Sequence, residues 1–393
     1  MKKLIISELN EVKKEYATER KSEIQEEIDD LVIDKMAMVS KEEVMVSITR
    51  KGYCKRSSMK SYSASEGVLP ATKENDLIVS ITKAMTTDTL LLFTNKGNYL
   101  YIPVYELNEG KWKDEGVHIN NIVTLTSEEY IISALLVKDF NKDINIVMVS
   151  KNGIVKRTSI EEFKAQRYTK PIKCMGLKSD DAMVGASYSD GDSEIVVVSE
   201  TGNALRYHEN GVPLLGIKSS GVKAVSDISK TGHIVGSVVL TNESTRLMYL
   251  VTDKGGHKVI NPRNINLTLR TNKATPVYKC FKSDPHKVVG VGFVNEEKKA
   301  YALTNKNETL EVDISERAQP FDKNIRGELE LKDKELVILT STNEVCVVSK
   351  DTLTYHIEEQ FTIDKKEEKE EVEEKQDENY EKISIMDLLG DDF

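Results

Sequence analysis

An internal repeat constrains the fold of this chain more than any other feature of its 393 residues. A β-branched run, a short turn containing Lys, Asn or Gly, and a second run recur six times, and a fragmentary seventh copy follows. The six copies are MVSITRKGYCKRSS, TLLLFTNKGNYLYIPV, NIVMVSKNGIVKRTSI, EIVVVSETGNALRYHE, RLMYLVTDKGGHKVINP and KAYALTNKNETLEVDI, and the fragment is LVILTSTNEVCVVS. Their turn positions, which are 45, 56, 49, 53, 52 and 36 residues apart, are Gly52, Gly97, Gly153, Gly202, Gly255, Asn307 and Asn343. Periods of about 40 to 50 residues with a hairpin in each unit indicate radial β-repeats.

Each unit contains enough strands for one blade of a ring. The Lys-Gly, Asn-Gly, Thr-Gly and Gly-Gly turns supply the positive φ that a tight hairpin requires. The incoming strands are mostly continuous apolar runs, as expected of strands covered on both faces. The segments DLIVSITKA (76–84), EYIISALLVKD (129–139) and HKVVGVGFVN (286–295) read as an additional strand of their units. We therefore predict an all-β, six-bladed propeller-like ring with three to four strands per unit, which the seventh stretch closes or completes.

The two ends of the chain differ from the repeat. From Ser7 to about Asp30 apolar residues recur at three- and four-residue steps without Gly or Pro, which predicts a helix. Its other faces are charged, so it either packs along a second helix, lies on the main domain or frays. After Asp364 the chain becomes DKKEEKEEVEEKQDENYEKISIMDLLGDDF, and so dense a charge block predicts disorder.

The net charge of −10 conceals a partition along the chain. Residues 1–44 hold 8 basic and 12 acidic side chains, and residues 364–393 hold 5 and 13. The remaining 45–363 hold 42 and 40, so the repeat region is slightly basic although the whole chain is acidic. The overall sign therefore does not exclude a nucleic-acid partner.

Several classes of function lack support in the sequence. No segment approaches the roughly 18 apolar residues of a membrane helix, and the first residues do not form a secretory signal. The four cysteines lie tens of residues apart without a CxxC pair, which argues against a zinc site and a disulfide framework and fits a reducing cytoplasm. We find no GxGxxG, P-loop, HExxH or GxSxG motif, and the six histidines lie singly. We predict no catalytic residue and no metal site.

Cations recur at the turns and shortly after them. If each hairpin occupies an equivalent place in its blade, residues two to four after each turn lie at the same height, and their cations form a band around the perimeter. Such a band suits a duplex whose phosphates it can follow, with little reading of the bases. The fourth and sixth units are poorer in these cations. The predicted DNA-binding residues are Lys51, Lys55, Arg56, Lys60, Lys96, Lys113, Lys151, Lys156, Arg157, Arg167, Lys170, Lys173, Lys254, Lys258, Arg263, Arg270 and Lys273.

These segments resemble a known family. KGYCKRSSMKSYSASEG, TNKGNYLYIPVYELNEGKWKDEG, KNGIVKRTSIEEFKAQRY and NINLTLRTNKATPV are similar to the C-terminal DNA-wrapping domain, the β-pinwheel, of the A subunits of bacterial DNA gyrase and topoisomerase IV. The stretch IISELNEVKKEYATERKSEI resembles the return helix of the coiled-coil arm that precedes this domain. The resemblance divides the chain into an arm helix and linker (1–43), a six-bladed pinwheel of four-stranded blades (44–363) and an acidic tail (364–393).

The resemblance implies sequence-nonspecific binding and bending or wrapping of double-stranded DNA. In such subunits the cleavage machinery lies N-terminal to the arm, so this chain would be a C-terminal portion that is inactive alone. The implied partners are the cleavage core of the same polypeptide and the ATPase subunit, with ATP and Mg²⁺ bound there and no cofactor in this chain. The implied location is the cytoplasm, with the nucleoid. Arg167-Tyr168 looks like the pair around the family's nucleophilic tyrosine, but its position after a hairpin indicates a non-catalytic Tyr168 and a DNA contact at Arg167.

The two subfamilies differ at a glycine- and arginine-rich heptapeptide that gyrase carries in its first blade. The aligned stretch here, SASEGV at 63–68, lacks the arginines and brings an acid. This departure favours the topoisomerase IV type, with roles in decatenation and relaxation, over a gyrase type that supports negative supercoiling. A propeller scaffold that binds proteins is an alternative of another class, because a fold alone does not determine function.

Overall fold

The computed structural model describes residues 1–19, 38–140, 143–241, 244–279, 283, 285–295, 298–315, 318–321, 331, 334–340 and 346–347. The chain divides into two units, one of Met1–Val39 and one from Ser40 onward. The first unit contains helix α1 (Lys2–Tyr16), whose side chains are all exposed. Residues 20–30 of the predicted helix lie outside the described residues, and its role as an arm helix stays a prediction.

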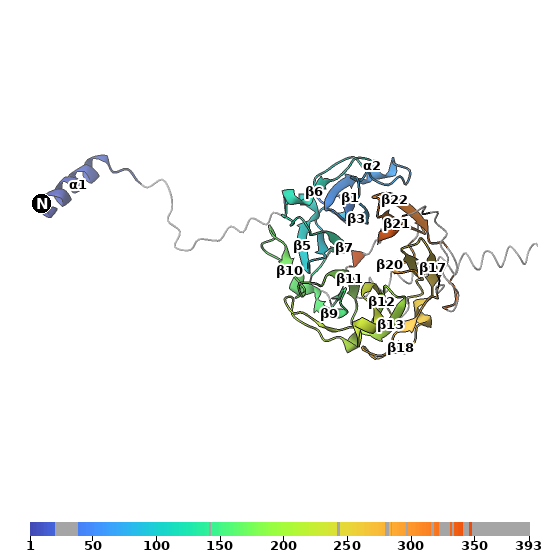
Figure 1. The fold of residues 1–393 in the computed structure, drawn as a ribbon. Helices are drawn as coiled ribbons and strands as arrows, with labels where there is room; N and C mark the ends of the chain where they lie inside the picture. Colours follow the sequence, from blue (N-terminus) through green and yellow to red (C-terminus); the bar gives the residue numbers. More distant parts are fainter. Residues whose placement is uncertain are drawn as a thin grey trace, which may run out of the picture. The chain divides into compact units, whose positions relative to one another are not determined.

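From Ser40 onward, six sheets are arranged as the blades of a ring (Figure 1). Each blade consists of an antiparallel hairpin and a third strand that pairs with the first strand of the hairpin. The three strands of blades 1 to 6 are, in order, β1 (Glu43–Thr49), β2 (Tyr53–Ser58) and β3 (Ile78–Met85); β4 (Thr89–Thr94), β5 (Asn98–Pro103) and β7 (Ile131–Val137); β8 (Asn145–Ser150), β9 (Ile154–Ser159) and β11 (Met183–Ser189); β12 (Glu194–Ser199), β13 (Asn203–His208) and β15 (Ile234–Leu240); β16 (Met248–Thr252), β17 (His257–Ile260) and β20 (Val288–Phe293); and β21 (Lys299–Thr304), β22 (Thr309–Asp313) and β23 (Leu336–Thr340). The predicted six-bladed, propeller-like ring is confirmed.

The hairpin turns have the backbone conformation that their residues predict. Gly52, Gly97, Gly153, Gly202 and Gly255 have φ between 74° and 91°, and the sixth turn uses an asparagine, Asn307, at 66°. The seventh turn position falls outside the described residues. At Gly202 an added Cβ would also come within 1.9 Å of the Tyr278 ring, so glycine is required there by both conformation and space.

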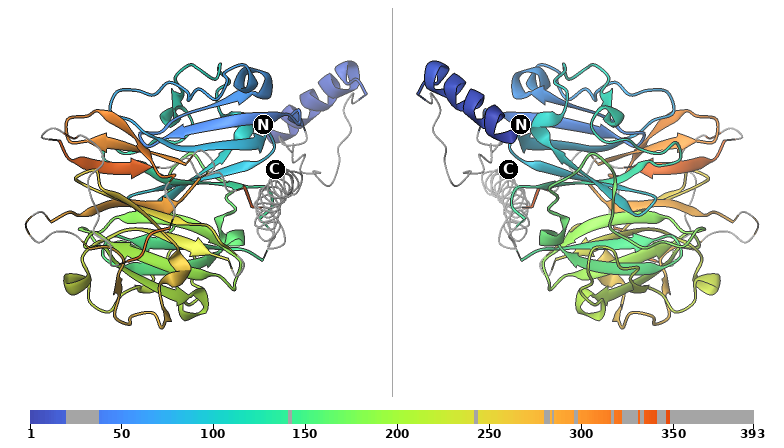
Figure 2. Two further views of the ribbon diagram at one scale, coloured as in Figure 1. Left: turned by 90° about the vertical axis from the view of Figure 1, so that its right-hand side faces the viewer. Right: turned by 90° about the vertical axis from the view of Figure 1, so that its left-hand side faces the viewer.

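The third strands line the centre of the ring. β3, β7, β11, β15, β20 and β23 follow one another around the hub, and each contacts the next (Figure 1). The strands run from one face of the ring to the other (Figure 2). The described residues of the seventh repeat join two other blades: β23 completes blade 6, and the short β24 (Cys346–Val347) pairs in parallel with β7 of blade 2.

The chain crosses between blades along the outer edge of the ring. After a hairpin it makes a 3₁₀ turn and then adds a short strand to the outer edge of the preceding blade. The turns and short strands are η2 (Val104–Glu106) with β6 (Val117–His118), η4 (Ile160–Phe163) with β10 (Ile172–Lys173), η5 (Glu209–Gly211) with β14 (Val222–Lys223), and η6 (Pro262–Asn264) with β18 (Leu267–Thr268) and β19 (Thr275–Pro276). We call 104–118, 160–173, 209–223 and 262–276 the outer connectors of blades 1, 2, 3 and 4.

The apolar cores lie between consecutive blades. In β4, Leu90 and Leu92 pack towards blade 1 while Leu91 and Phe93 pack towards blade 3, which explains the continuous apolar runs. Three further clusters join blades 3 to 4, 4 to 5 and 5 to 6. Burying such runs, at about 25 cal/mol per Å² of apolar surface, makes each blade depend on its neighbours.

Blade 1 is the first of this series. The face of blade 1 that points away from blade 2 is covered by a different cluster. There β1 presents Met45 on the same face as the polar Ser47 and Thr49, and a separate cluster around Trp112 covers Met45. Helix α2 (Met59–Ser63) contributes Met59 and Tyr62 to this cluster, with Ser58 accepting a hydrogen bond from the amide of Ser61 as its N-cap. The indole of Trp112 donates to the carbonyl of Val68 at 2.7 Å.

The remaining helices are short and sit at the ends of strands. They are η3 (Ile119–Asn121), which follows β6, and α3 (Ile228–Thr231), which precedes β15. Within the described residues no helix has the length and apolar character needed to cross a membrane. The predicted acidic tail at 364–393 lies outside the described residues, and the three domain boundaries stay predictions.

Candidate nucleic-acid interface

The lysine three positions after the turn glycine recurs in blades 1, 3 and 5, as Lys55, Lys156 and Lys258. All three are buried, with exposed fractions of 1%, 0% and 0%. The ammonium group of Lys55 donates to the carbonyls of Lys111 at 2.8 Å, Trp112 at 2.5 Å and Asp114. The outer connector of blade 1 thus wraps around the end of this side chain.

The other two lysines make equivalent contacts. The ammonium group of Lys156 donates to the carbonyls of Cys174 at 2.6 Å and Ile217 at 2.5 Å. That of Lys258 donates to the carbonyl of Phe321 at 3.3 Å. Each lysine therefore fixes a crossing segment to its blade by hydrogen bonds, which buried ammonium groups require.

The predicted surface position of Lys55, Lys156 and Lys258 was wrong. Their register in the blades is as predicted, but the crossing segment of the next repeat covers them. In blades 2, 4 and 6 the same position holds leucine, at Leu100, Leu205 and Leu310. This alternation with an apolar residue is a sequence signal for an inward-facing site.

Burial gives Lys156 an unusual titration. Desolvation lowers its pKa from 10.5 to about 8. Between these values the unfolded chain binds a proton that the folded chain lacks, so this group makes the free energy of unfolding rise with pH.

We therefore expect the wild type to gain stability relative to the Lys156→Met variant between pH 7.5 and pH 10. The gain should be on the order of 1 kcal/mol, after allowance for solvent screening. Urea unfolding of both chains at several pH values measures it. Parallel pH profiles of the two chains would contradict the assignment.

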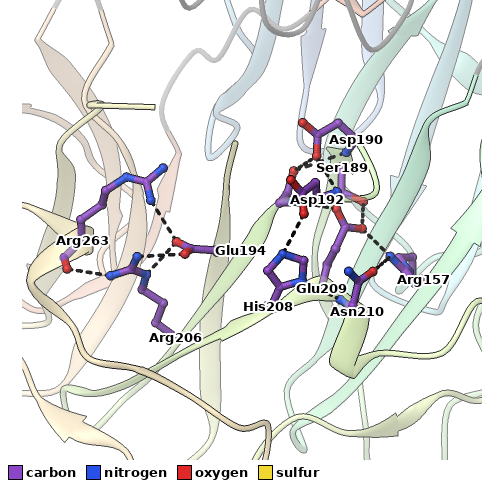
Figure 3. A network of polar contacts seen from close by, with 11 residues as sticks. Arg157, Ser189, Asp190, Asp192, Glu194, Arg206, His208, Glu209, Asn210 and Arg263 are labelled. Carbon is purple, nitrogen blue, oxygen red and sulfur yellow. Dashed lines mark hydrogen bonds and ion pairs between the residues drawn. The ribbon is translucent and has the colours of Figure 1, made fainter. Parts of the chain in front are cut away.

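Arginine follows that lysine in two blades, and one terminal nitrogen of each guanidinium binds an outer connector. The Nε of Arg157 is buried and has no hydrogen-bond partner among the described residues. Arg157 in β9 donates to Glu209 at 2.9 Å, and Glu209 is fully buried at the start of η5 (Figure 3). The same carboxylate accepts from the hydroxyl of Ser189 and the amide of Ser193, both at 2.7 Å. In blade 1, Arg56 donates to the carbonyl of Tyr105 at 2.9 Å. Both arginines therefore bind the outer connectors, and their role as DNA contacts stays a prediction.

Blade 4 uses two arginines around one carboxylate (Figure 3). Arg206 pairs with both oxygens of Glu194, at 2.7 and 2.9 Å, and donates to the carbonyls of Arg263 and Ile265. Arg263 donates to Glu194 at 3.2 Å and to the carbonyls of Ser244 and Thr241. The predicted contact Arg263 thus fastens η6 to blade 4.

The predicted lysines at the hairpin turns lie at one end of the blades. Lys51, Lys96 and Lys151 are exposed, and Lys254 is half-buried. Lys96 pairs with Glu128 at 3.0 Å, and Lys51 donates to the carbonyl of Glu74 at 3.0 Å. These lysines can be reached by solvent, and their role as DNA contacts stays a prediction.

The outer connectors differ strongly in charge. Connector 104–118 holds two basic and four acidic residues. Connectors 160–173, 209–223 and 262–276 together hold nine basic and three acidic residues, a net of +6. We call these three segments, on the outer edges of the consecutive blades 2, 3 and 4, the basic arc.

Seven cations of the basic arc are exposed, and none has an ion-pair partner among the described residues. Four of them were predicted as DNA contacts, whereas Lys164, Lys218 and Lys223 were not. These three cations of the third and fourth repeats fall between the 3₁₀ turn and the end of the short outer strand, as do the predicted ones of the same connectors. The seven residues are Lys164, Arg167, Lys170, Lys173, Lys218, Lys223 and Lys273.

Three other predicted residues have different surroundings. Lys60 in α2 and Lys113 are exposed, but both belong to the outer surface of blade 1, whose connector is acidic. Arg270 is half-buried, and its guanidinium donates to the carbonyls of Gly211 at 2.9 Å and Lys223. Arg270 therefore ties the connector of blade 4 to that of blade 3.

Tyr168 lies in the connector of blade 2, where it contacts the side chains of Glu106 and Tyr101. Its hydroxyl donates to the carboxylate of Glu106 at 2.9 Å, and its ring packs against Tyr101 with centroids 5.3 Å apart. Burial and the neighbouring carboxylate raise its pKa, which opposes formation of a nucleophilic phenolate. No group of three or more potential metal ligands comes together in the part of the chain that the structure describes.

Comparison with known proteins adds independent observations. A family model described as "DNA gyrase C-terminal domain, beta-propeller" matches residues 43–84, 88–138, 145–189 and 193–241, which correspond to blades 1 to 4. The A subunit of DNA topoisomerase 4 from Bacillus subtilis (strain 168) is 32% identical over 314 residues, covering 80% of this chain and 39% of that protein. Its counterpart from Staphylococcus aureus (strain MRSA252) is 34% identical over 304 residues, covering 77% and 38%.

A solved structure agrees with these sequence matches. The crystal structure of a C-terminal domain of DNA topoisomerase IV superimposes with a TM-score of 0.68 at 32% identity. The match covers 77% of this chain and 94% of that domain. This chain spans about two fifths of the length of the curated relatives that it matches.

Proposed function

Because this chain belongs to the family formed by the C-terminal domains of the DNA gyrase and topoisomerase IV A subunits, we propose that it binds duplex DNA along the basic arc and bends it, without sequence preference. The observation that carries this proposal is the concentration of seven exposed cations on the outer edges of three consecutive blades. A convex, positively charged edge suits a bent duplex, because successive phosphates can meet cations on successive blades. Contacts to phosphates carry no sequence information, so affinity should be similar for any duplex.

Salt dependence tests this function directly. Each phosphate that a cation neutralises contributes about −0.9 to the slope of log K against log salt, so five to seven contacts predict a slope of about −4.5 to −6.3. Fluorescence anisotropy with labelled 40-base-pair duplexes from 50 to 300 mM KCl measures the slope. Duplexes of unrelated sequence should bind with similar affinity. Binding that ignores salt, or that selects one sequence strongly, would refute the proposal.

In the holoenzyme, the bent duplex would be the segment that passes through a cleaved duplex, in the decatenation and relaxation reactions of topoisomerase IV. The partners would be the catalytic core of the same polypeptide and the ATPase subunit, with ATP and Mg²⁺ bound there and no cofactor in this chain. This chain alone would have no activity. Its place of action would be the nucleoid in the cytoplasm.

The loop at residues 63–68 supports the topoisomerase IV type over the gyrase type. It follows α2, and Glu66 stands exposed in a left-handed conformation at φ 55°. An acid in place of arginines weakens any hold on DNA at this position. Ligation of nicked circles with this chain should therefore trap little positive writhe, whereas gyrase-type wrapping would trap it strongly.

A further inference from the structure

Three leucines of the basic arc project into solvent. The exposed fractions are 55% for Leu214, 52% for Leu267 and 77% for Leu269. A single exposed leucine is ordinary on a protein surface. Three on two adjacent outer connectors, among cations that we assign to DNA binding, require a specific explanation.

Two of these leucines occupy the same place in consecutive blades. Leu214 lies opposite Arg157 of blade 3, and Leu267 lies opposite Arg206 of blade 4. Both arginines are four residues after the turn glycine of their blades. In blade 1, whose connector is acidic, Glu109 lies at this place opposite Arg56. The leucines therefore follow the repeat in blades 3 and 4, two of the three blades whose connectors are basic.

The backbone that carries Leu269 is held in a strained and braced turn. Thr271 has φ 78°, an uncommon conformation for a β-branched residue. The amide of Asn272 donates to the carbonyl of Leu269 at 3.1 Å. Arg270 binds the carbonyls of Gly211 and Lys223, so the turn is fixed to the connector that carries Leu214. A turn fixed in this way holds the side chain of Leu269 at the surface and prevents it from packing into the ring.

The charge around the leucines indicates which kind of molecule they can bind. Connector 262–276 contains no acidic residue, and the one acid of 209–223, Glu209, is fully buried. A partner must therefore combine dense negative charge with an apolar surface between the charges. The minor groove of a duplex has this arrangement, with sugars and base steps between two phosphate rows.

We propose that Leu214, Leu267 and Leu269 act as apolar wedges that enter the minor groove and bend the duplex held by the basic arc. The inference rests on the proposed function and adds the residues that deform the DNA. The cations hold the phosphates, while the leucines partly unstack base steps and so favour a step that is already unpaired, whatever the surrounding sequence.

The test compares the full chain with its Leu214→Ser/Leu267→Ser/Leu269→Ser variant and with the single Leu269→Ser variant. The probes are a fully paired 40-base-pair duplex and the same duplex with a two-base mismatch, both end-labelled for energy transfer. We expect the wild type to prefer the mismatched duplex by about tenfold, the equivalent of about 1.4 kcal/mol. The triple variant should lose this preference and most of the bend, while its salt slope changes by less than about one. The Leu269→Ser variant should show a partial loss.

Two exposed valines outside the basic arc provide the matched control. Val68 and Val117 are 53% and 38% exposed, and their replacement by serine should leave the bend and the mismatch preference unchanged. If the triple variant bends DNA as the wild type does, with normal affinity, the wedge role of the leucines is refuted while the proposed DNA-binding function stands. A chain that shows no salt-dependent duplex binding at all overturns the proposed function as well. An equal loss of bending in the valine control also overturns the wedge.

Discussion

Reversing four charges of the basic arc should lower duplex affinity by about a hundredfold or more at 100 mM salt. The variant is Lys170→Glu/Lys173→Glu/Lys218→Glu/Lys223→Glu, and all four lysines are exposed on the outer connectors of blades 2 and 3. Each lost phosphate contact should flatten the salt slope by about one, so the slope should fall by about three to four. Anisotropy titrations over a range of salt measure both quantities, and the loss should be similar on any duplex sequence.

A second quadruple variant with the same net charge isolates the effect of position. It carries Lys51→Glu, Lys96→Glu, Lys151→Glu and Lys306→Glu, which place the reversals at the hairpin turns. Long-range repulsion alone should cost this chain only a few-fold in affinity, and salt should screen most of it beyond about 10 Å. If the two variants lose affinity equally, the hairpin turns contribute as much as the basic arc, and the proposal that the basic arc alone positions the DNA is wrong.

The sequence predicts the fold well because the fold depends on local signals that repeat. Each turn glycine has positive φ, and Asn307 takes the same conformation where glycine is missing. The segments predicted as additional strands, including 76–84 and 129–139, form β3 and β7 at the hub. Continuous apolar runs are correctly associated with strands covered on both faces, since each blade packs against two neighbours.

The candidate site was harder to predict, because the position of a residue along its blade does not determine which way its side chain points. Lys156 and Arg157 are adjacent and follow their turn as predicted, yet both face the connector that the next repeat supplies. Their partners Ile217 and Glu209 lie more than fifty residues later in the sequence. No local pattern gives such a contact. The crossing of each connector to the preceding blade is a tertiary feature, and it decides which cations stay exposed.

Removing the carboxylate of Glu209 from its buried pair with Arg157 should destabilise the ring strongly, because it leaves a buried charge without a partner. Glu209 has no exposed side-chain surface, and that of Arg157 is 12% exposed. Glu209→Ala would leave the guanidinium without its counter-charge and the amide of Ser193 without its acceptor. We expect a loss of about 3 to 5 kcal/mol in the free energy of unfolding.

The exposed pair of His208 and Asp192 lies in the same network (Figure 3) and serves as the control. Its atoms are 3.1 Å apart, but its side chains are 35% and 53% exposed, so Asp192→Ala should cost less than about 1 kcal/mol. A double-mutant cycle between Glu209→Ala and Arg157→Met should give a coupling of about 1 to 3 kcal/mol. Coupling near zero would mean that Glu209 acts through Ser189 and Ser193 alone. Because Glu209 begins the connector that carries Lys218 and Lys223, its loss should also weaken DNA binding, which makes this buried carboxylate a support of the basic arc.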